Sequence, residues 1–419
     1  MLKREQNELL TRTGPGTAMG RMFRSYWLPA LLEDELPEND CPPVRVALLG
    51  ERLLALRDTS GRMGLIEEFC AHRRTSLWFG RNEEGGIRCA YHGWKYDVTG
   101  QCVEVPSESE SGFCKRVKLT SYPLIARGGI LWTYMGPPEK QPPLPEYEFA
   151  LVTSEQRFVS KRLQECNWLQ ALEGGIDSSH VSFLHRATLN TDPLFKGARS
   201  NQYNLDDAKP HFEVAEAPGG LFVGARRKAE NGNWYWRVTP WIMPCVTIVP
   251  PRSDYPVHGH FWIPIDDENC WAWSFDYHPT RALTKAEVAA MCDGHGVHVK
   301  YVPGTYRARA NKDNDYLMDR AAQKAGRSFS GVEGIAMQDA SLQESMGPIV
   351  DRSREHLGRS DKAIVRARRR LLQAALRLRD EGVQPPGVSD PASYRRRGCQ
   401  LVLPPDTDWL EASEADQRC

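Results

Sequence analysis

Two short segments near residue 70 constrain this chain more than any other feature. Cys70 and His72 form a CxH motif, and sixteen residues later Cys89 and His92 form a CxxH motif. Two thiolates and two imidazoles are the ligands of a Rieske [2Fe–2S] cluster, in which cysteines hold one iron and histidines the other. Because neutral imidazoles replace two thiolates, the reduction potential of such a cluster is raised. The spacing therefore predicts a Rieske cluster that accepts electrons and passes them on.

A structural zinc site is the alternative for the same four residues, because two cysteines and two histidines also bind zinc. Zinc ligands usually come as a cysteine pair followed by a histidine pair. Here each short segment carries one residue of each kind, which favours two loops holding a two-iron cluster between them. The remaining cysteines are interpreted as ordinary small residues.

Charge and composition exclude several classes of function. The 54 basic residues are balanced by 54 acidic residues, so no electrostatic argument favours nucleic acid or an anionic membrane as a partner. No apolar run approaches the ~18 residues that span a bilayer, and the charged N-terminus lacks the apolar segment of a secretory signal. The 11 cysteines show no regular disulfide spacing. We therefore expect a cytoplasmic redox enzyme with two or three domains.

A proline-rich segment around residues 136–147 divides the chain. Before it, short alternating stretches predict an antiparallel β domain with hairpins at 44–58 and 94–105. After it, further strands with one covered face alternate with helical patterns; the helices are expected at 164–185, 283–293, 333–346 and 353–380. The arginine-rich helix at 353–380 is expected to dock on the protein's own surface rather than on nucleic acid. The predicted units are an N-terminal segment 1–21, a cluster domain 22–136, a linker 137–155, a second domain 156–395 and a C-terminal tail 396–419.

A second group of potential metal ligands follows the linker. Asp177 and His180 are three residues apart and share a helix face, whereas His185 lies five residues further on. A helix distorted at 174–175, where two glycines occur, would bring both imidazoles to one ion. An oxygen-activating Fe(II) site also needs a carboxylate; Asp177 and a remote residue such as Asp339 are both candidates. The alternative is a pair of capping or buried histidines, but a predicted cluster needs a destination for its electrons.

Taken together, these motifs resemble the Rieske non-haem iron ring-hydroxylating oxygenases, specifically the phthalate 4,5-dioxygenase oxygenase-component group. The resemblance rests on CxH…CxxH combined with DxxHxxxxH, and on the segments 7–32, 80–108, 167–185 and 338–357. It implies an α+β fold, in which an all-β Rieske domain precedes a helix-grip (START/Bet v 1-like) catalytic domain with an antiparallel sheet and C-terminal helices.

The resemblance also implies roles for individual residues. The implied cluster ligands are Cys70, His72, Cys89 and His92, and the implied ligands of a mononuclear Fe(II) are His180, His185 and Asp339. Asp177 corresponds to the aspartate that links a cluster histidine of one subunit to an iron histidine of the next, which agrees with the tendency of ligand histidines to donate to carboxylates. Asn167 corresponds to a polar residue beside the iron. The chain departs from the family's C-P-H-R-G pattern at Ala71 and Arg74, which adds charge and bulk near the cluster.

The activity implied by the resemblance belongs to aromatic hydrocarbon catabolism. It is the O₂-dependent dihydroxylation of a phthalate-like aromatic carboxylate, driven by a separate NADH-dependent reductase that carries FMN and a plant-type [2Fe–2S] centre. Homotrimers with head-to-tail contacts, stacked as hexamers in some of the group, are also implied. A monooxygenase or O-demethylase of a substituted benzoate is the first alternative. A pure electron-transfer Rieske protein is the second, and the second group of potential ligands argues against it.

Substrate-binding residues are predicted from chemistry rather than from a motif. An aromatic carboxylate favours a fixed guanidinium, because arginine holds it with two hydrogen bonds. Alternation along residues 234–239 places Arg237 on one face of a strand, which makes it the first candidate. Arg226 on a neighbouring strand is the second candidate, and Ser178 beside Asp177 is a third. A structural ion pair is the alternative interpretation of each arginine.

Overall fold

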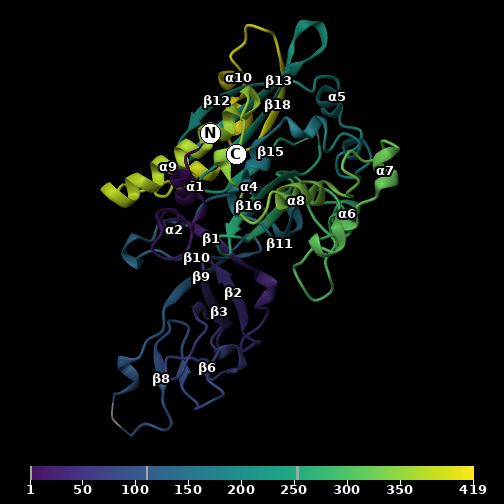
Figure 1. Ribbon diagram of the computed structural model, residues 1–419. Helices are drawn as coiled ribbons and strands as arrows, with labels where there is room; N and C mark the ends of the chain where they lie inside the picture. The colour runs from purple at the N-terminus through teal and green to yellow at the C-terminus, as the bar shows by residue number, and fades with distance from the viewer. Residues whose placement is uncertain (1, 110–111, 252–253) are drawn as a thin grey trace.

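The computed structural model describes residues 2–109, 112–251 and 254–419, and it forms two lobes (Figure 1). The lower lobe in Figure 1 contains the β strands of the first third of the chain, and the upper lobe contains the larger sheet and most helices. The first two helices, α1 Arg4–Thr11 and α2 Ala18–Arg24, pack against the long helix α9 Lys362–Glu381. The N-terminal helices therefore lie against a C-terminal helix of the upper lobe.

The lower lobe is built on an antiparallel sheet with the order β1-β10-β9-β4-β3-β2. The hairpin predicted at 44–58 is confirmed, because β2 and β3 pair across a tight turn at Leu49 and Gly50, both with positive φ. The strands are β1 Trp27–Leu32, β2 Val44–Leu48, β3 Glu51–Arg57, β4 Met63–Glu67, β9 Ser121–Arg127 and β10 Ile130–Tyr134.

A smaller four-stranded sheet forms the tip of the lower lobe, farthest from the helices of the upper lobe in Figure 1. The hairpin predicted at 94–105 is confirmed by the pairing of β7 with β8. A separate hydrophobic cluster, which includes Leu54, Ile66, Leu77 and Ile87, lies between the two sheets. The strands of the tip are β5 Arg81–Glu83, β6 Gly86–Arg88, β7 Lys95–Tyr96 and β8 Cys102–Glu104.

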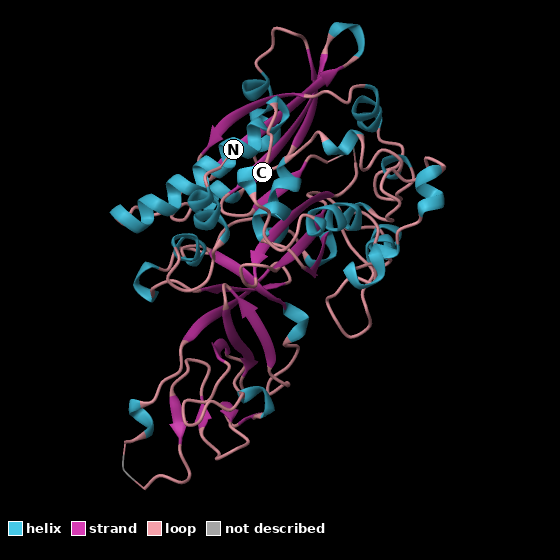
Figure 2. Cartoon of the chain, viewed as in Figure 1, coloured by secondary structure: helices cyan, strands magenta, loops and turns pink. Residues whose placement is uncertain are grey.

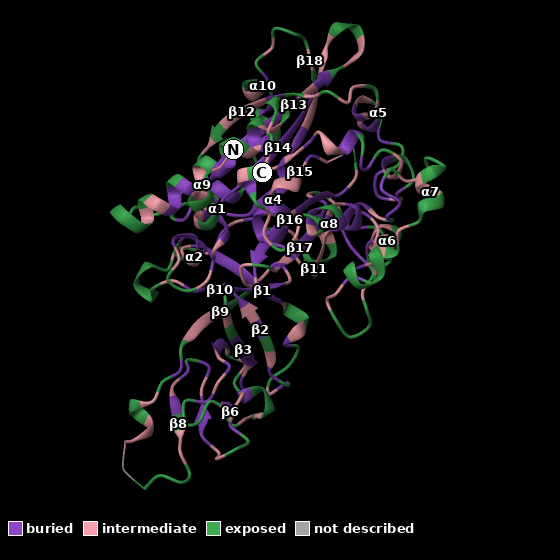
Figure 3. Ribbon diagram, in the orientation of Figure 1, coloured by how far each residue is buried: buried purple, intermediate pink, exposed green. Residues whose placement is uncertain are grey.

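The upper lobe is built around one antiparallel sheet with the order β11-β17-β16-β15-β14-β13-β12. Its central strands are buried (Figure 3), because α4 and α8 cover one face and further segments cover the other. Figure 2 shows how helices surround these strands. The strands are β11 Arg157–Gln164, β12 His211–Ala217, β13 Gly220–Lys228, β14 Trp234–Ile242, β15 Val246–Val249, β16 Val257–Pro264, β17 Cys270–Tyr277 and β18 Cys399–Leu403.

The remaining helices connect and cover these strands. They are α3 Glu148–Leu151, α4 Trp168–Ile176, α5 Arg199–Asp206, α6 Lys285–Cys292, α7 Arg320–Lys324, α8 Ile335–Ser345 and α10 Trp409–Gln417. The helices predicted at 283–293 and 333–346 are confirmed by α6 and α8. The all-β domain followed by an antiparallel sheet with helices agrees with the predicted α+β class. Within the described residues, no helix has the length and apolarity that a membrane crossing requires.

Three sequence expectations about this lobe were wrong. The helix predicted at 164–185 ends at Ile176, because the Asp177 carboxylate accepts hydrogen bonds from the backbone of Ser179 and His180 and turns the chain. The helix predicted at 353–380 begins only at Lys362, after short 3₁₀ turns. The predicted tail 396–419 belongs to the sheet, since β18 pairs with β14.

Candidate metal centres and substrate cavity

The two loops that carry the CxH and CxxH motifs fold in the same way. In each, the cysteine N–H donates to a carbonyl five residues on, Thr75 at 2.9 Å or Trp94 at 2.8 Å. In each, the N–H of the residue four positions after the cysteine donates to the cysteine carbonyl. This residue is Arg74 in the first loop, at 2.9 Å, and Gly93 in the second, at 3.0 Å. Both of these residues have positive φ, +60° and +76°. Two equivalent loops therefore present one cysteine and one histidine each.

The four side chains lie as a two-iron cluster requires. Cys70 and Cys89 are 2% and 3% exposed, whereas His72 is exposed at the surface. The rings of His72 and His92 have their centroids 4.5 Å apart, so the imidazoles form one pair at the outer end of the site. The Tyr96 hydroxyl lies 3.3 Å from Cys70 Sγ, where it is a donor to sulfur. Buried thiols and outer imidazoles fit a [2Fe–2S] cluster with its histidine-bound iron near solvent.

A single zinc ion does not fit these loops equally well. A zinc site brings all four ligand atoms around one point. Among the described residues, the group whose potential ligand atoms converge on one point is His180, His185 and Asp339, with these atoms within 4.8 Å of one another. The spread of the two loop pairs therefore favours the dinuclear interpretation.

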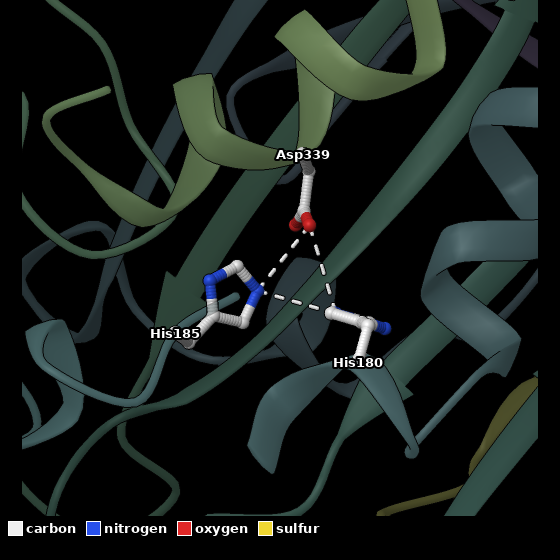
Figure 4. A group of neighbouring side chains, drawn as sticks. All are labelled: His180, His185 and Asp339. Carbon is white, nitrogen blue, oxygen red and sulfur yellow. Dashed lines mark hydrogen bonds and ion pairs between the residues drawn. The ribbon is translucent and has the colours of Figure 1, made fainter. Parts of the chain in front are cut away.

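The second group of ligands converges in the upper lobe (Figure 4). His180 lies on a 3₁₀ turn after α4, His185 follows it, and Asp339 projects from α8. The Nε2 atoms of the two histidines are 3.2 Å apart. Asp339 Oδ1 lies 3.2 Å from His185 Nε2 and 3.6 Å from His180 Nε2. Two imidazoles and one carboxylate with open space beside them form the donor set of a 2-His-1-carboxylate iron site.

The hydrogen bonds behind the two imidazoles decide which ring nitrogens are free. His180 Nδ1 faces the carboxylate of Asp177 at 3.3 Å, and a carboxylate only accepts. His185 Nδ1 faces Gln338 Oε1 at 2.8 Å, while the amide nitrogen of Gln338 donates elsewhere. Both Nδ1 atoms must therefore donate, and both Nε2 atoms carry lone pairs that point at each other and at Asp339. Three acceptors facing one point fit a cation.

Electrostatics at this point also favours a cation. Burial opposes ionisation of Asp339, but the charges of His185 and His180 lower its pKa to about 2. Burial also opposes protonation of His180, yet Asp177 and Asp339 raise its pKa above the ordinary value. Burial acts against ionisation of Asp177 too, and the hydrogen bond from His180 holds its pKa below the ordinary value. The two carboxylates are therefore ionised at neutral pH beside the imidazoles, which suits a site for a cation.

The close approach of α4 to the sheet depends on a glycine. A side chain at Gly175 would meet the Trp262 ring of β16 at 2.3 Å, so only glycine fits there. This packing holds the C-terminal end of α4 beside the cavity, and Asp177 and His180 begin where the helix ends. From the sequence, the glycine pair is interpreted as a site of helix distortion. The structure instead shows that Gly175 allows close packing of α4 on the sheet.

A cavity beside the three ligands contains the first predicted substrate residue. Arg237 lines it and is 6% exposed. Its Nη1 donates to Ser178 Oγ and Thr239 Oγ1, both at 3.3 Å, and both acceptors are neutral. Burial lowers the pKa of Arg237. Among the described residues, no carboxylate forms an ion pair with this guanidinium, so the cavity contains a buried positive charge available to an anion.

Arg227 was missed by the sequence analysis, although strand alternation gives the signal for it. It follows Arg226 on β13 and so points to the opposite face. Arg227 is fully buried and donates to the carbonyl of Ser178 at 2.7 Å, to Ser178 Oγ at 3.3 Å and to the carbonyl of Asp207 at 3.1 Å. Burial and the charge of Arg237 lower the pKa of Arg227 to about 10. Ser178, a predicted substrate residue, is thus engaged by two arginines.

Two predicted site residues lie elsewhere. Arg226 packs against the rings of Trp234 and Trp236 at 4.6 and 5.8 Å and faces Glu213 at 3.7 Å, outside the cavity. Asn167 caps the N-terminus of α4 and donates to the carbonyls of Thr11 and Asp267. Because a helix rises about 1.5 Å per residue, this cap lies roughly 15 Å from the end of α4 that carries the ligands. The expectation that Asn167 lies beside the iron is therefore wrong.

Two other buried arginines of the same lobe have acidic partners, in contrast to Arg162, Arg227 and Arg237. Arg352 and Arg368 both bind Glu173 of α4, with N–O distances of 3.2 and 2.6 Å. Burial would raise the pKa of Glu173, but the two arginines hold it below its ordinary value. Of the three buried arginines without an acidic partner among the described residues, Arg162 and Arg237 line the cavity.

Comparison with known proteins agrees with both lobes. A model described as the Rieske [2Fe-2S] domain matches residues 26–123, and one described as LigXa C-terminal domain like matches residues 133–418. The chain is 37% identical to the 3-chlorobenzoate-3,4-dioxygenase oxygenase subunit of Comamonas testosteroni, over 98% of this chain and 97% of that protein. It is 36% identical to the phthalate 4,5-dioxygenase oxygenase subunit of Pseudomonas putida, over 98% and 94%.

The fold is also similar to solved structures. The crystal structure of dicamba monooxygenase bound to dicamba superposes with a TM-score of 0.59. The superposition covers 84% of this chain and 97% of that chain, at 17% identity. At this identity, the likeness speaks for the architecture of the two lobes.

Proposed function

The chain belongs to the Rieske non-haem iron oxygenases with a LigXa-C-like catalytic domain, and from this premise we propose that it dihydroxylates a phthalate-like aromatic carboxylate. It is the terminal oxygenase subunit of an aromatic oxygenase system. The observation that carries the substrate class is the buried, unpaired guanidinium of Arg237 in the cavity beside the three ligands.

The assignment of ligands follows from the donor sets. We assign Cys70, His72, Cys89 and His92 to the [2Fe–2S] cluster and His180, His185 and Asp339 to the mononuclear Fe(II). When bound, the cluster supplies single electrons and the Fe(II) supplies the activation of O₂. The protein contributes the orientation of the imidazoles, whose Nδ1 protons are held by Asp177 and Gln338, and a cavity with apolar walls.

Arg237 is suited to anchor the substrate. A guanidinium binds a carboxylate with two charge-assisted hydrogen bonds. In Arg237, the hydrogen bonds to neutral partners involve only the Nη1 atom. The neighbouring positive charge of Arg227 favours an anion near Arg237. An aromatic acid bound through its carboxylate would lie against apolar residues such as Trp262 and Val249, which also line the cavity. This arrangement fixes the ring and excludes water.

The separation of the two centres supports a head-to-tail oligomer. In Figure 1 the tip of the lower lobe lies far from α4 and α8, so the cluster of one chain does not reach its own triad. We propose a homotrimer, with or without stacking, in which the tip of one subunit meets the catalytic lobe of the next. Asp177, which binds His180 and keeps 25% of its side chain exposed, is assigned the bridging position between subunits.

A separate electron donor is required, and we propose an NADH-dependent reductase with FMN and a plant-type [2Fe–2S] centre. A cytoplasmic location is proposed with it, because the 11 cysteines form no disulfide within the described residues. The family also contains monooxygenases, and a monooxygenase or O-demethylase acting on a substituted benzoate is the second candidate function.

The substrate class is tested by pairing each acid with its neutral ester. Chemically reduced holoenzyme would be mixed with O₂ and phthalate, 3-chlorobenzoate, 3-methoxybenzoate or their methyl esters, and products would be identified by mass. We expect product from at least one acid and none from the matching ester. Equal conversion of acid and ester would overturn the carboxylate assignment, and product from neither, at full iron content, would overturn the substrate class.

A further inference from the structure

A third imidazole faces the cavity without joining the three ligands. His260 of β16 lines the same cavity, but its nitrogens are outside the group of atoms that converge at His180, His185 and Asp339. In the sheet, His260 lies opposite Thr247 of β15 and Ser274 of β17. Residues directly opposite one another on neighbouring antiparallel strands share a face. The cavity side of the sheet therefore contains a polar row where a hydrophobic core would be expected.

The hydrogen bonds of Ser274 fix the proton on His260. Ser274 Oγ donates to the carbonyl of Val297 at 3.0 Å, which uses its single proton because a carbonyl only accepts. Arg162 Nη1 donates to the same Oγ at 3.5 Å. His260 Nδ1 lies 3.2 Å from this oxygen and must therefore be a donor as well. The proton of the neutral ring resides on Nδ1, and Nε2 carries a lone pair.

That lone pair has no donor within the protein. Among the described residues, no donor is found at Nε2 of His260; besides Ser274, the ring has a hydrogen bond with the backbone of Trp273. Ser274 uses its only proton on Val297, and the hydrogen bonds of the neighbouring Arg162 go to Ser274 and Gln164 rather than to His260. A cavity acceptor left without a donor costs free energy unless water or a ligand satisfies it. The substrate cavity thus has a guanidinium at Arg237 and an acceptor at His260, with the buried Arg162 also in its lining.

From this polarity, and resting on the function proposed above, we propose that His260 Nε2 accepts a hydrogen bond from a hydroxyl group on the ring of the aromatic acid. A carboxylate is the wrong partner for Nε2, because two acceptors repel, and Arg237 already provides for it. A methoxy or chloro substituent cannot donate. His260 is therefore a specificity-determining residue that favours hydroxybenzoate-type acids over their methylated counterparts.

The test is equilibrium binding to the holoenzyme without O₂. Calorimetry would compare 3- and 4-hydroxybenzoate with the matching methoxybenzoates and with benzoate. One neutral hydrogen bond is worth about three- to tenfold in affinity, so we expect one hydroxybenzoate to bind tighter than its methoxy partner by that factor. In His260→Phe the preference, measured as the ratio of the hydroxybenzoate and methoxybenzoate affinities of the same variant, should vanish.

Two further variants keep the result interpretable. Thr247→Val removes a hydroxyl from the same row, where Thr247 is fully buried, and should retain the preference. His260→Asn supplies another acceptor and should recover part of it if the phenylalanine variant does not fold. Equal binding of hydroxy and methoxy acids by the wild type, or a preference that survives in His260→Phe, would overturn the role of His260. Failure of every benzoate to bind would instead contradict the proposed function.

Discussion

The two metal centres are built in opposite ways. The cluster loops are short, local and at the surface, where the backbone within six residues determines how each cysteine and histidine lies. The triad is internal and combines a turn after α4 with a side chain of α8, from a distant part of the chain. His185 is 4% exposed, whereas His72 is exposed. The first site needs only its own loops, and the second exists only when the whole upper lobe is packed.

This difference predicts that mutations in the upper lobe remove one metal and spare the other. In Asp339→Asn, the mononuclear site loses its ionised ligand, and changes even behind a ligand cost about 10- to 100-fold in metal affinity. We expect at least about a 100-fold loss of iron affinity there and no measurable turnover. Iron analysis should fall from about three to about two atoms per chain while the visible spectrum of the cluster is unchanged. Loss of the cluster as well would contradict the independence of the two centres.

The buried ion pairs of α4 provide a second way to separate the centres. Glu173→Gln leaves Arg352 without an acidic partner and Arg368 with Glu355 alone, and breaking a buried ion pair typically costs about 3–5 kcal/mol. Because the folded-state pKa of Glu173 is held below its ordinary value, its contribution is present at neutral pH and is lost as the pH falls through the folded-state pKa. Urea unfolding at several pH values would measure this loss. Glu381→Gln, which removes an exposed pair with Arg377, should change stability little, and an equal loss there would contradict the account.

Asp177 tests the link between the two centres. Asp177→Asn keeps the volume but removes the charge behind His180, so we expect both metal sites to be occupied and turnover to slow by about 10- to 100-fold. Stopped-flow reoxidation of the reduced cluster would locate the defect in electron transfer between subunits. Normal turnover would remove Asp177 from the bridging position.

Arg237 lies in the cavity and Arg226 lies outside it, so the two arginines provide a test variant and a control variant for substrate binding. Arg237→Met should raise the apparent KM for aromatic acids by about tenfold or more, since a charge-assisted hydrogen bond contributes about 1.5–3 kcal/mol. Arg226→Met, on the outer face with Trp234 and Trp236, should leave KM unchanged. An unchanged KM in Arg237→Met would contradict substrate binding by Arg237 and favour a structural role.

The smallest effect is expected in the cluster loops, where Arg74 occupies the position that Gly93 fills in the other loop. A left-handed conformation costs a non-glycine residue about 1–2 kcal/mol. Arg74 recovers part of this through Glu67 and the ring of Phe69, although its side chain is 59% exposed. Arg74→Gly should therefore stabilise the loop by up to about 1 kcal/mol, and Gly93→Ala should destabilise it. Thermal bleaching of the cluster would report both, and the opposite signs would refute the equivalence of the loops.

The same contrast explains how much the sequence could predict. Cys70, His72, Cys89 and His92 are close together in the chain, so their spacing alone indicated a cluster. For the triad, the sequence pattern did not decide whether Asp177 or Asp339 is the carboxylate ligand, and only the family resemblance favoured Asp339. Folding resolves the choice geometrically, because α4 stops at Ile176 and turns Asp177 behind His180 rather than beside it.

Side-chain direction accounts for the other differences. Arg226 and Arg227 are neighbours on one strand, so alternation places them on opposite faces of the sheet but does not say which face is buried. Asn167 failed as a site residue because a helix cap and a ligand look alike in sequence, whereas the length of α4 separates them. Nothing in the sequence was a reason to select His260, because its proposed role depends on the hydrogen bond with Ser274, which is opposite it in the sheet.

The most direct test of the central claim is a single turnover in ¹⁸O₂ with an aromatic acid that the enzyme accepts. The account predicts a product heavier than the substrate by two labelled oxygen atoms and two hydrogens, as cis-dihydroxylation of the ring requires. A product with one labelled oxygen, or one that has lost a methyl group, would contradict dihydroxylation and establish the monooxygenase alternative.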